Sequence, residues 1–379
     1  MKKITLMFSL FVSILTNAQQ IISTNTTWSG NVFLSQKVIV NEGATLKIEA
    51  GTKVQIAYLD ANGDNIGDVE IEINGEIQID GILGCSSVIF SPVTSTVDKK
   101  YWNGLTINSK KQNSISGVEI YNANRALTIK SNVIINSTLI NNFYDVGIYL
   151  SPTVKSSTVK LNSITLKNGG TGIHSEIDSS NIYLNSSLID SCVNGVINSF
   201  SNFKMSNSKI SNCSRIAVST EDGKMDINNC MINDNYSFGI INSSSDLKVS
   251  KTTIKDNYLG GIIIAGFAKN YVQNSSVINN IGSQFEITDY KFNIAKGSTF
   301  AVFEGSPFIK VNNNNIYGDT LKIAVDSLNL FPLLLSDVTA DLYGISIQSP
   351  QSRNILRFTP VTGRLHSFNT DVQLDMEML

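Results

Sequence analysis

A motif of about 22 residues repeats through the middle of the chain. Its anchor is an apolar residue before a polar turn, and the anchor recurs at Ile115, Ile135, Leu161, Leu184, Met205, Ile227, Val249 and Val272. Five residues after each anchor stands a second aliphatic residue. A period of this length is typical of solenoids, in which each repeat forms one circuit and stacks on the one before it.

Short β-strands are predicted within each repeat. Apolar and polar residues alternate over runs of three to five residues, as in a strand with one face turned inward. Turn-forming Asn, Ser, Asp and Gly interrupt the runs, and no stretch keeps a helical period through three turns. We therefore predict an all-β fold, a parallel β-helix of about 22 residues per coil, with Met205 and Ile227 one rung apart.

A column of turn residues lies seven positions after the anchor. It reads Asn122, Asn142, Asn168, Ser191, Asn212, Asp234, Asp256 and Asn279. Asn tolerates the left-handed conformation of a tight turn, and stacked amides can hydrogen-bond from coil to coil, so we expect both in this column. One position later, Cys192 and Cys213 fall on adjacent coils. A pair of buried thiols is expected there, with a disulfide as the alternative.

The N-terminus has the pattern of a secretory signal peptide. Lys2 and Lys3 precede an apolar stretch of about a dozen residues, and Ala18 offers the cleavage point. This stretch is short of the ~20 residues that a membrane-spanning helix needs, and no later apolar segment is long enough. The chain is therefore expected to be secreted, to an extracellular site or the outer cell surface, and not to span a membrane.

The repeat also divides the chain into segments. The cap is expected to shield the first coil from edge-to-edge association, and the tail to form either closing coils or a small β-module. The predicted segments are a signal peptide over 1–18, an N-terminal cap with opening coils over 19–112, regular repeats over 113–287 and a β-rich tail over 288–379.

Charge limits the classes of partner. Charged residues make up 16% of the chain, and 29 basic residues face 31 acidic ones without a long basic run. Nucleic-acid binding depends on many Lys and Arg side chains at phosphates, so this class is excluded. A polysaccharide or a cell-surface glycan is the expected partner.

Three segments of the opening coils carry a family resemblance. They read KVIVNEGATLKIEAGTKVQI, EIEINGEIQIDG and YWNGLTI. Together with the repeats, over roughly residues 30–287, they resemble secreted bacterial right-handed parallel β-helix proteins of the pectate-lyase-like superfamily. The resemblance implies a right-handed coil. It leaves activity open, because that superfamily includes lyases, glycosidases, epimerases and adhesins.

A first candidate site is an acidic loop, in which Asp60, Asn62, Asp64 and Asp68 place oxygen atoms at alternate positions as calcium loops do. The loop has Asn65 where a calcium loop has Gly, and it lacks an acidic residue at the twelfth position. Calcium binding is one interpretation, and a solvated turn between strands is the other.

A second candidate site lies in the turns of two adjacent coils. Tyr236 and Tyr258 both fall nine positions after their anchors, in the column that also holds Tyr144. Two stacked phenol rings make a flat platform for the face of a sugar. Asp234 and Asp256 lie beside them, where they either replace Asn in the turn or form a pair of acids of the kind that glycosidases and lyases use.

No catalytic set can be assembled from the remaining residues. The chain has two His, His174 and His366, and five Arg, and His174 is expected on the surface of a coil. The favoured function is therefore a secreted, non-catalytic β-helix that binds carbohydrate or acts as an adhesin. The alternatives are a polysaccharide lyase or glycoside hydrolase with an unrecognised active site, and a structural spacer in a cell-surface assembly.

Overall fold

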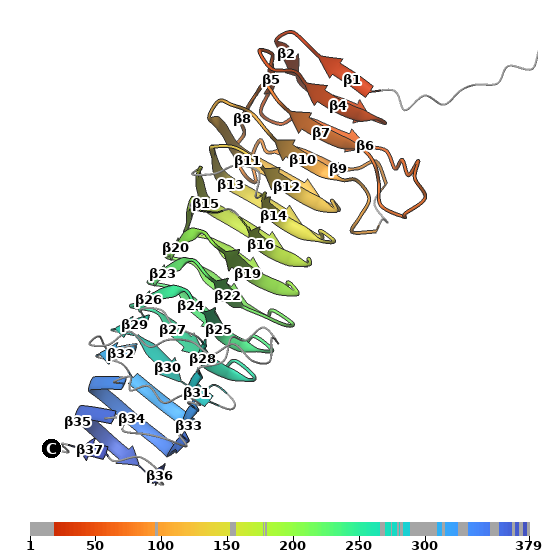
Figure 1. The fold of residues 1–379 in the computed structure, drawn as a ribbon. Helices are drawn as coiled ribbons and strands as arrows, with labels where there is room; N and C mark the ends of the chain where they lie inside the picture. Colours follow the sequence, from red (N-terminus) through yellow and green to blue (C-terminus); the bar gives the residue numbers. More distant parts are fainter. Residues whose placement is uncertain are drawn as a thin grey trace, which may run out of the picture.

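The computed structural model is a long stack of β-coils (Figure 1). It describes residues 19–94, 98–151, 157–176, 178, 180–265, 270–273, 275–278 and 280, and, for the tail, the backbone of 283–288, 309–312, 315–324, 333–348, 356–365, 368–370 and 374–376. The predicted signal peptide, Asn279 and His366 lie outside the described residues.

Three parallel faces run the length of the stack. The first is formed by β1 (Gln19–Ile22), β4 (Lys37–Val40), β7 (Glu70–Ile73), β10 (Gly104–Ile107), β12 (Arg125–Ile129), β14 (Val146–Leu150), β16 (Thr171–Ser175), β19 (Asn194–Ser199), β22 (Val218–Glu221), β25 (Phe238–Ser243), β28 (Gly260–Ala265) and β31 (Ser283–Thr288). The second is formed by β2 (Thr26–Trp28), β5 (Thr45–Ile48), β8 (Glu76–Asp80), β17 (Asn181–Asn185), β20 (Asn202–Ser206), β23 (Lys224–Asn228), β26 (Asp246–Ser250), β29 (Asn270–Gln273) and β32 (Ile309–Asn312). The third is formed by β3 (Asn31–Leu34), β6 (Lys53–Ile56), β9 (Val88–Pro92), β18 (Leu188–Asp190), β21 (Lys209–Ser211), β24 (Met231–Asn233), β27 (Thr253–Lys255) and β30 (Ser276–Ile278).

Some strands bend across two faces, and the tail continues the stack. The strands that run through both the second and the third face are β11 (Asn113–Tyr121), β13 (Val133–Asn141) and β15 (Thr158–Lys167). The tail strands, which also pair in parallel, are β33 (Asn315–Ala324), β34 (Leu333–Gln348), β35 (Leu356–Leu365), β36 (Phe368–Thr370) and β37 (Leu374–Met376). Within the described residues no helix is long and apolar enough to cross a bilayer.

The predicted parallel β-helix is confirmed by its register. All eight anchors form one ladder, in which Met205 pairs with Ile227 and Ile227 with Val249. The second aliphatic column forms another ladder, from Ile120 to Val277. Both columns are buried, so the side chains that repeat in sequence fill one continuous core.

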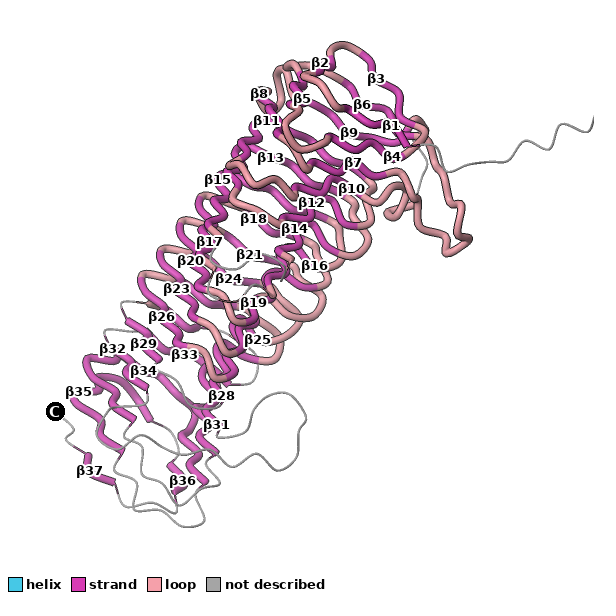
Figure 2. The backbone as a smooth tube through the Cα atoms, turned by 45° about the horizontal axis from the view of Figure 1, so that its top comes forward, coloured by secondary structure: helices cyan, strands magenta, loops and turns pink. Residues whose placement is uncertain are grey.

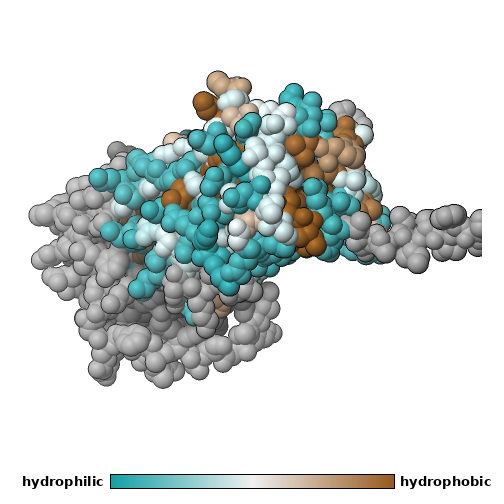
Figure 3. All heavy atoms as spheres, turned by 90° about the horizontal axis from the view of Figure 1, so that it is seen from above, coloured by the Kyte–Doolittle hydropathy of each residue, from teal (hydrophilic) through white to brown (hydrophobic). Residues whose placement is uncertain are grey.

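The first coil is the exposed N-terminal end of the stack. The segment expected to act as a cap contains β1, β2 and β3, which pair in parallel with β4, β5 and β6. Ile21 and Phe33 are exposed at this end, and Figure 3 shows apolar atoms there among polar ones. The segment is therefore the first circuit of the helix itself.

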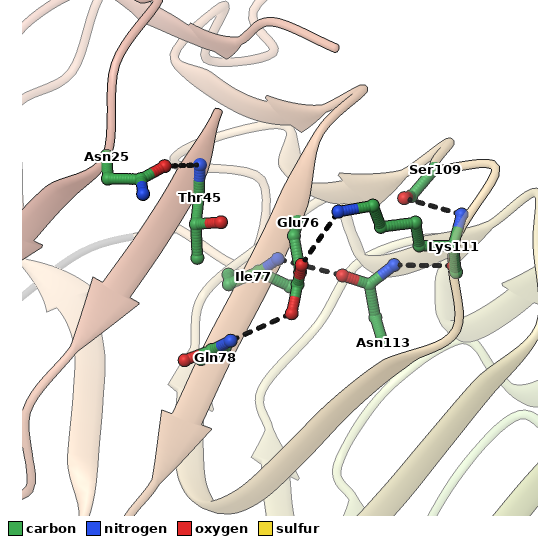
Figure 4. Close-up of polar contacts among 8 residues, drawn as sticks. All are labelled: Asn25, Thr45, Glu76, Ile77, Gln78, Ser109, Lys111 and Asn113. Carbon is green, nitrogen blue, oxygen red and sulfur yellow. Dashed lines mark hydrogen bonds and ion pairs between the residues drawn. The ribbon is translucent and has the colours of Figure 1, made fainter. Parts of the chain in front are cut away.

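Side-chain amides support the turns between the first and second faces. Asn25 Oδ1 accepts a hydrogen bond from the backbone N–H of Thr45 at 3.0 Å, and Asn113 Oδ1 accepts one from that of Ile77 at 2.8 Å (Figure 4). Each amide thus satisfies a backbone donor at the start of a strand on a neighbouring coil, where the parallel ladder does not supply an acceptor.

The turn column between the third and first faces has the predicted conformation. Its described members, from Asn122 to Asp256, all have positive φ, between 55° and 61°. In this column the Asn168 amide donates to Asn141 Oδ1 of the coil before at 2.9 Å, so amides also bond between coils at the surface. The buried ladder lies one residue later, at Asn235, Asn257 and Asn280, because only that position points into the core.

Cys192 and Cys213 occupy this inward position on the two coils before the Asn ladder. Both are buried free thiols, so the structure favours the thiol pair over the disulfide. Burial raises the pKa of Cys192 to about 11 and that of Cys213 to about 12. Cys230 is also buried and its pKa is raised to about 11, whereas Cys85 is exposed.

These thiols should differ sharply in reactivity. At pH 8 a thiol reagent such as iodoacetamide should modify Cys85 in the folded protein, because reaction requires an accessible thiolate. Cys192, Cys213 and Cys230 should react only after unfolding in urea. Mass spectrometry counts the adducts, and rapid modification of more than one cysteine in the folded protein would contradict the buried placement.

Candidate functional site

Tyr236 and Tyr258 form an exposed aromatic platform on two adjacent coils. The side chains are 67% and 56% exposed. Their ring centroids are 6.0 Å apart, and the ring planes are inclined by 28° in a stacked arrangement. Two rings that stack on each other while both stay exposed leave aromatic surface to solvent that the protein's own core does not use.

The backbone of the turn holds both rings in this position. In each turn the residue before the inward Asn has positive φ, with 58° at Asp234 and 55° at Asp256. This conformation reverses the chain so that Asn235 points inward and Tyr236 points outward. The Tyr236 N–H then bonds Cys213 O at 2.9 Å, and the Tyr258 N–H bonds Asn235 O at 2.8 Å.

The buried Asn ladder fixes the spacing of the platform. Asn257 Oδ1 accepts hydrogen bonds from both the side-chain and backbone N–H groups of Asn235, at 2.9 and 3.2 Å. Asn280 Oδ1 accepts the same pair of bonds from Asn257, at 2.8 and 3.0 Å. Because these amides are almost completely buried, the turns are tied one above the other, and the tyrosines with them.

The two acids beside the platform are engaged locally. The Asn233 amide donates a hydrogen bond to Asp234, and Lys255 Nζ lies 2.9 Å from Asp256 Oδ2. Both acids adopt the left-handed conformation in which Asp replaces Asn. Their placement is that of turn residues, and nothing in their contacts assigns them to proton transfer.

The carboxylates of the acidic loop accept hydrogen bonds from the backbone of the same loop. Asp60, Asp64 and Asp68 accept hydrogen bonds at 2.6–3.0 Å from the backbone N–H groups of Ala61, Gly63, Asn65 and Ile66. The Asn62 amide adds bonds to Asp64 and Asp68, at 3.2 and 3.4 Å. In the part of the chain that the structure describes, no three His, Cys, Asp or Glu side chains converge as metal ligands. The contacts are those of an Asx-rich turn.

Calcium binding at this loop stays a prediction of the sequence. Bound calcium would stabilise the folded state, so the melting temperature would rise with calcium and fall with a chelator. A melting temperature that changes with neither calcium nor chelator would contradict calcium binding at this loop.

A second polar cluster, which the sequence did not single out, lies on the first face, and three of its members, Arg125, Asp145 and Tyr149, line a hollow of about 560 Å³. Arg125 Nε lies 2.6 Å from Asp145 Oδ2, and the guanidinium lies 4.6 Å from the ring centroid of Tyr149. The Tyr149 hydroxyl donates to Glu176 at 2.8 Å, and His174 Nε2 lies 3.1 Å from Glu176. These five side chains form a connected network at the surface of β12, β14 and β16.

Burial controls ionisation in this network. His174 lies on the surface of a coil, as expected, and is partly buried beside Tyr149. This burial lowers the pKa of its imidazole, whereas the charge of Glu176 acts in the opposite direction. Burial and the bond to Glu176 raise the pKa of Tyr149. The signal in the sequence is that both side chains follow a Gly-Ile step and so share an outward column, where Tyr149 pairs with His174.

Comparisons with known proteins identify no family for this chain. No family model matches the sequence, and no curated protein matches it. Similar solved structures are each 11–12% identical to this chain, and one is the periplasmic alginate epimerase AlgG, with a TM-score of 0.41 over 90% of this chain and 77% of that one. Another is a tailspike protein double mutant of the E. coli bacteriophage HK620, with a TM-score of 0.45 over 93% of this chain and 74% of that one. A third is the A-module of the Azotobacter vinelandii mannuronan C-5 epimerase AlgE6, with a TM-score of 0.23 over 92% of this chain and 91% of that one. The chain is a parallel β-helix protein. At these identities and TM-scores none of the likenesses bears on what this chain does.

Proposed function

We propose that this β-helix is a non-catalytic carbohydrate-binding protein, and that it holds the face of a sugar on Tyr236 and Tyr258. The observation that carries the proposal is the pair of stacked, solvent-facing rings, 6.0 Å apart. Export, predicted from residues 1–18, would bring the platform to polysaccharides or cell-surface glycans outside the cytoplasm.

The chemistry of a sugar explains the choice of ligand. The C–H groups on one face of a pyranose ring form an apolar surface that packs on an aromatic ring, while the hydroxyl groups at its edge stay hydrated. A protein ligand of ordinary size would need a larger apolar patch than two tyrosines provide. The local engagement of Asp234 and Asp256 favours binding over catalysis at this place.

Removing both rings should abolish retention of the glycan. In the double variant Tyr236→Ala, Tyr258→Ala, the loss of about 1 kcal/mol per ring predicts an affinity about 30-fold lower for the glycan that binds best on an array. Phe33→Ala removes an exposed aromatic side chain from the first coil and serves as the control. Equal retention of the glycan by the wild type and the double variant would contradict the proposal that these two tyrosines bind it.

The enzyme alternative has one observation in its favour. Arg125, Asp145 and Tyr149 line a hollow, and they are connected to His174 and Glu176 in one polar network. A polysaccharide lyase or hydrolase needs ionisable groups of this kind beside a cleft. Assays of reducing ends and unsaturated products against a panel of polysaccharides distinguish the two functions. Turnover that is lost in Glu176→Gln would replace the binding proposal with this alternative.

A further inference from the structure

The second face carries a cluster of side chains that neither the tyrosine platform nor the Arg125 network uses. Five successive strands, β15, β17, β20, β23 and β26, lie side by side there (Figure 2). Their central outward residues pair rung by rung, and we name this column with its flanks the lysine face. The central column reads Lys160, Tyr183, Lys204, Asp226 and Lys248.

The lysine face is hollowed. A cavity of about 730 Å³ is lined by Lys160, Tyr183, Lys204 and Asp226, and a second of about 400 Å³ continues it along Lys204 and Asp226 to Lys248. The two cavities share Lys204 and Asp226 and lie on the two flanks of the central column, and together, as the trough, they extend along the stack from Lys160 to Lys248. A trough of this shape accepts an extended chain.

The charge of the trough is positive although the whole chain carries -2. Lys160, Lys204, Lys224 and Lys248 line it against Asp226 and Asp246. Among the described residues none of these four lysines is within 4.0 Å of a carboxylate oxygen, unlike Lys37 and Lys255, which form ion pairs on other faces. Their ammonium groups therefore stay available to an external anion.

Neutral hydrogen-bonding groups surround the lysines. Tyr183 lies under Lys204, whose Nζ is 5.6 Å from the ring centroid. The flanking columns consist mainly of amides and hydroxyls, among them Asn162, Asn181, Asn185, Asn202, Ser206 and Asn228. Amides beside an aromatic ring suit sugar hydroxyls and sugar faces, whereas a lipid surface would call for exposed apolar side chains.

We propose that the lysine face binds an anionic polysaccharide that lies along the helix axis. Neighbouring rungs are about 4.8 Å apart, so Lys160, Lys204 and Lys248 follow one another at intervals of about 9.6 Å. This interval is close to the length of two sugar units in an extended chain, so an acidic group on every second sugar meets a lysine. The proposal is independent of the tyrosine platform, which lies on a different turn row.

The test compares two polymers with the same β-1,4-linked backbone, carboxymethyl-cellulose and neutral hydroxyethyl-cellulose, in affinity electrophoresis with the full chain. Carboxymethyl-cellulose should retard the wild type and hydroxyethyl-cellulose should not. The triple variant Lys160→Gln, Lys204→Gln, Lys248→Gln should bind the acidic polymer at least about tenfold more weakly, and 0.5 M salt should have a similar effect because the contacts are ionic.

Matched variants separate this site from a general charge effect. Lys53→Gln, Lys110→Gln, Lys209→Gln removes the same charge from exposed lysines outside this column and should bind as the wild type does. The tyrosine double variant should also keep its affinity for the acidic polymer, so the two binding proposals fail separately. The inference is overturned if the wild type does not bind carboxymethyl-cellulose, if both lysine triples bind alike, or if anionic vesicles or single-stranded DNA bind more tightly than the polymer.

Discussion

Gly117→Ala should be among the most destabilising single substitutions in this protein, by about 3 kcal/mol. Gly117 lies at the bend of β11 with φ of +63°, and a Cβ there would stand 2.1 Å from the carbonyl carbon of Gly81 and 2.5 Å from the Ile82 nitrogen. These are backbone atoms of the preceding coil, so no side-chain rotation relieves the clash. Urea denaturation followed by circular dichroism measures the loss.

Ser137→Ala is the matched control for this substitution. Ser137 occupies the same bend on the next coil, opposite Gly117 in the ladder, and it also has positive φ, at 47°. Ser137 already carries a Cβ in this conformation, so the substitution adds no atom at the position that is crowded at Gly117. Its stability should change by less than about 1 kcal/mol. If the two variants unfold at the same urea concentration, the backbone around Gly117 accommodates a Cβ, which contradicts this prediction.

Asn257→Ala should cost about 3 kcal/mol as well, through lost hydrogen bonds rather than crowding. Asn257 is fully buried, and its Oδ1 is the acceptor for two donors of Asn235, while its own amide bonds Ile232 O at 3.2 Å. Alanine leaves these buried groups without partners, at about 1–3 kcal/mol for each unsatisfied group. The melting temperature and the urea midpoint should both fall.

Two readouts make this prediction specific. Asn228→Ala removes an exposed amide from the coil before and should leave stability nearly unchanged. Because the ladder also ties Tyr236 to Tyr258, Asn257→Ala should weaken glycan retention even at temperatures where the protein remains folded. An unchanged urea midpoint would show that water or a shifted side chain satisfies Asn235 in the variant.

The sequence was sufficient to predict the ladders of the core. Apolar residues at equal offsets, such as Met205 and Ile227, can be aligned by counting because the core admits only apolar side chains at those positions. The equal offset of Tyr236 and Tyr258 from their anchors also predicted that they stack, and both follow turn residues with positive φ. Position in the repeat thus predicted which side chains stack.

The offset within the repeat does not predict which polar residue of a turn points inward. Asn235 and Asp234 are adjacent and both polar, and only the backbone conformation of the turn decides that the former is buried. The network of Arg125, Tyr149 and His174 was missed for a related reason. Tyr149 and His174 share an outward column, but side chains of different chemistry occupy it from coil to coil, so the column alone does not indicate a site, and the contacts depend on side-chain reach across rungs.

The fixed rise per coil sets the distance between the lysines of the lysine face, so this face should select its ligands by length. Lys160 and Lys248 are four rungs, or about 19 Å, apart. An oligomer shorter than this span reaches two of the three central lysines at most, whereas a longer one reaches all three within one molecule and gains avidity from each additional contact. Affinity for acidic oligosaccharides should therefore rise steeply up to about that length and then level off.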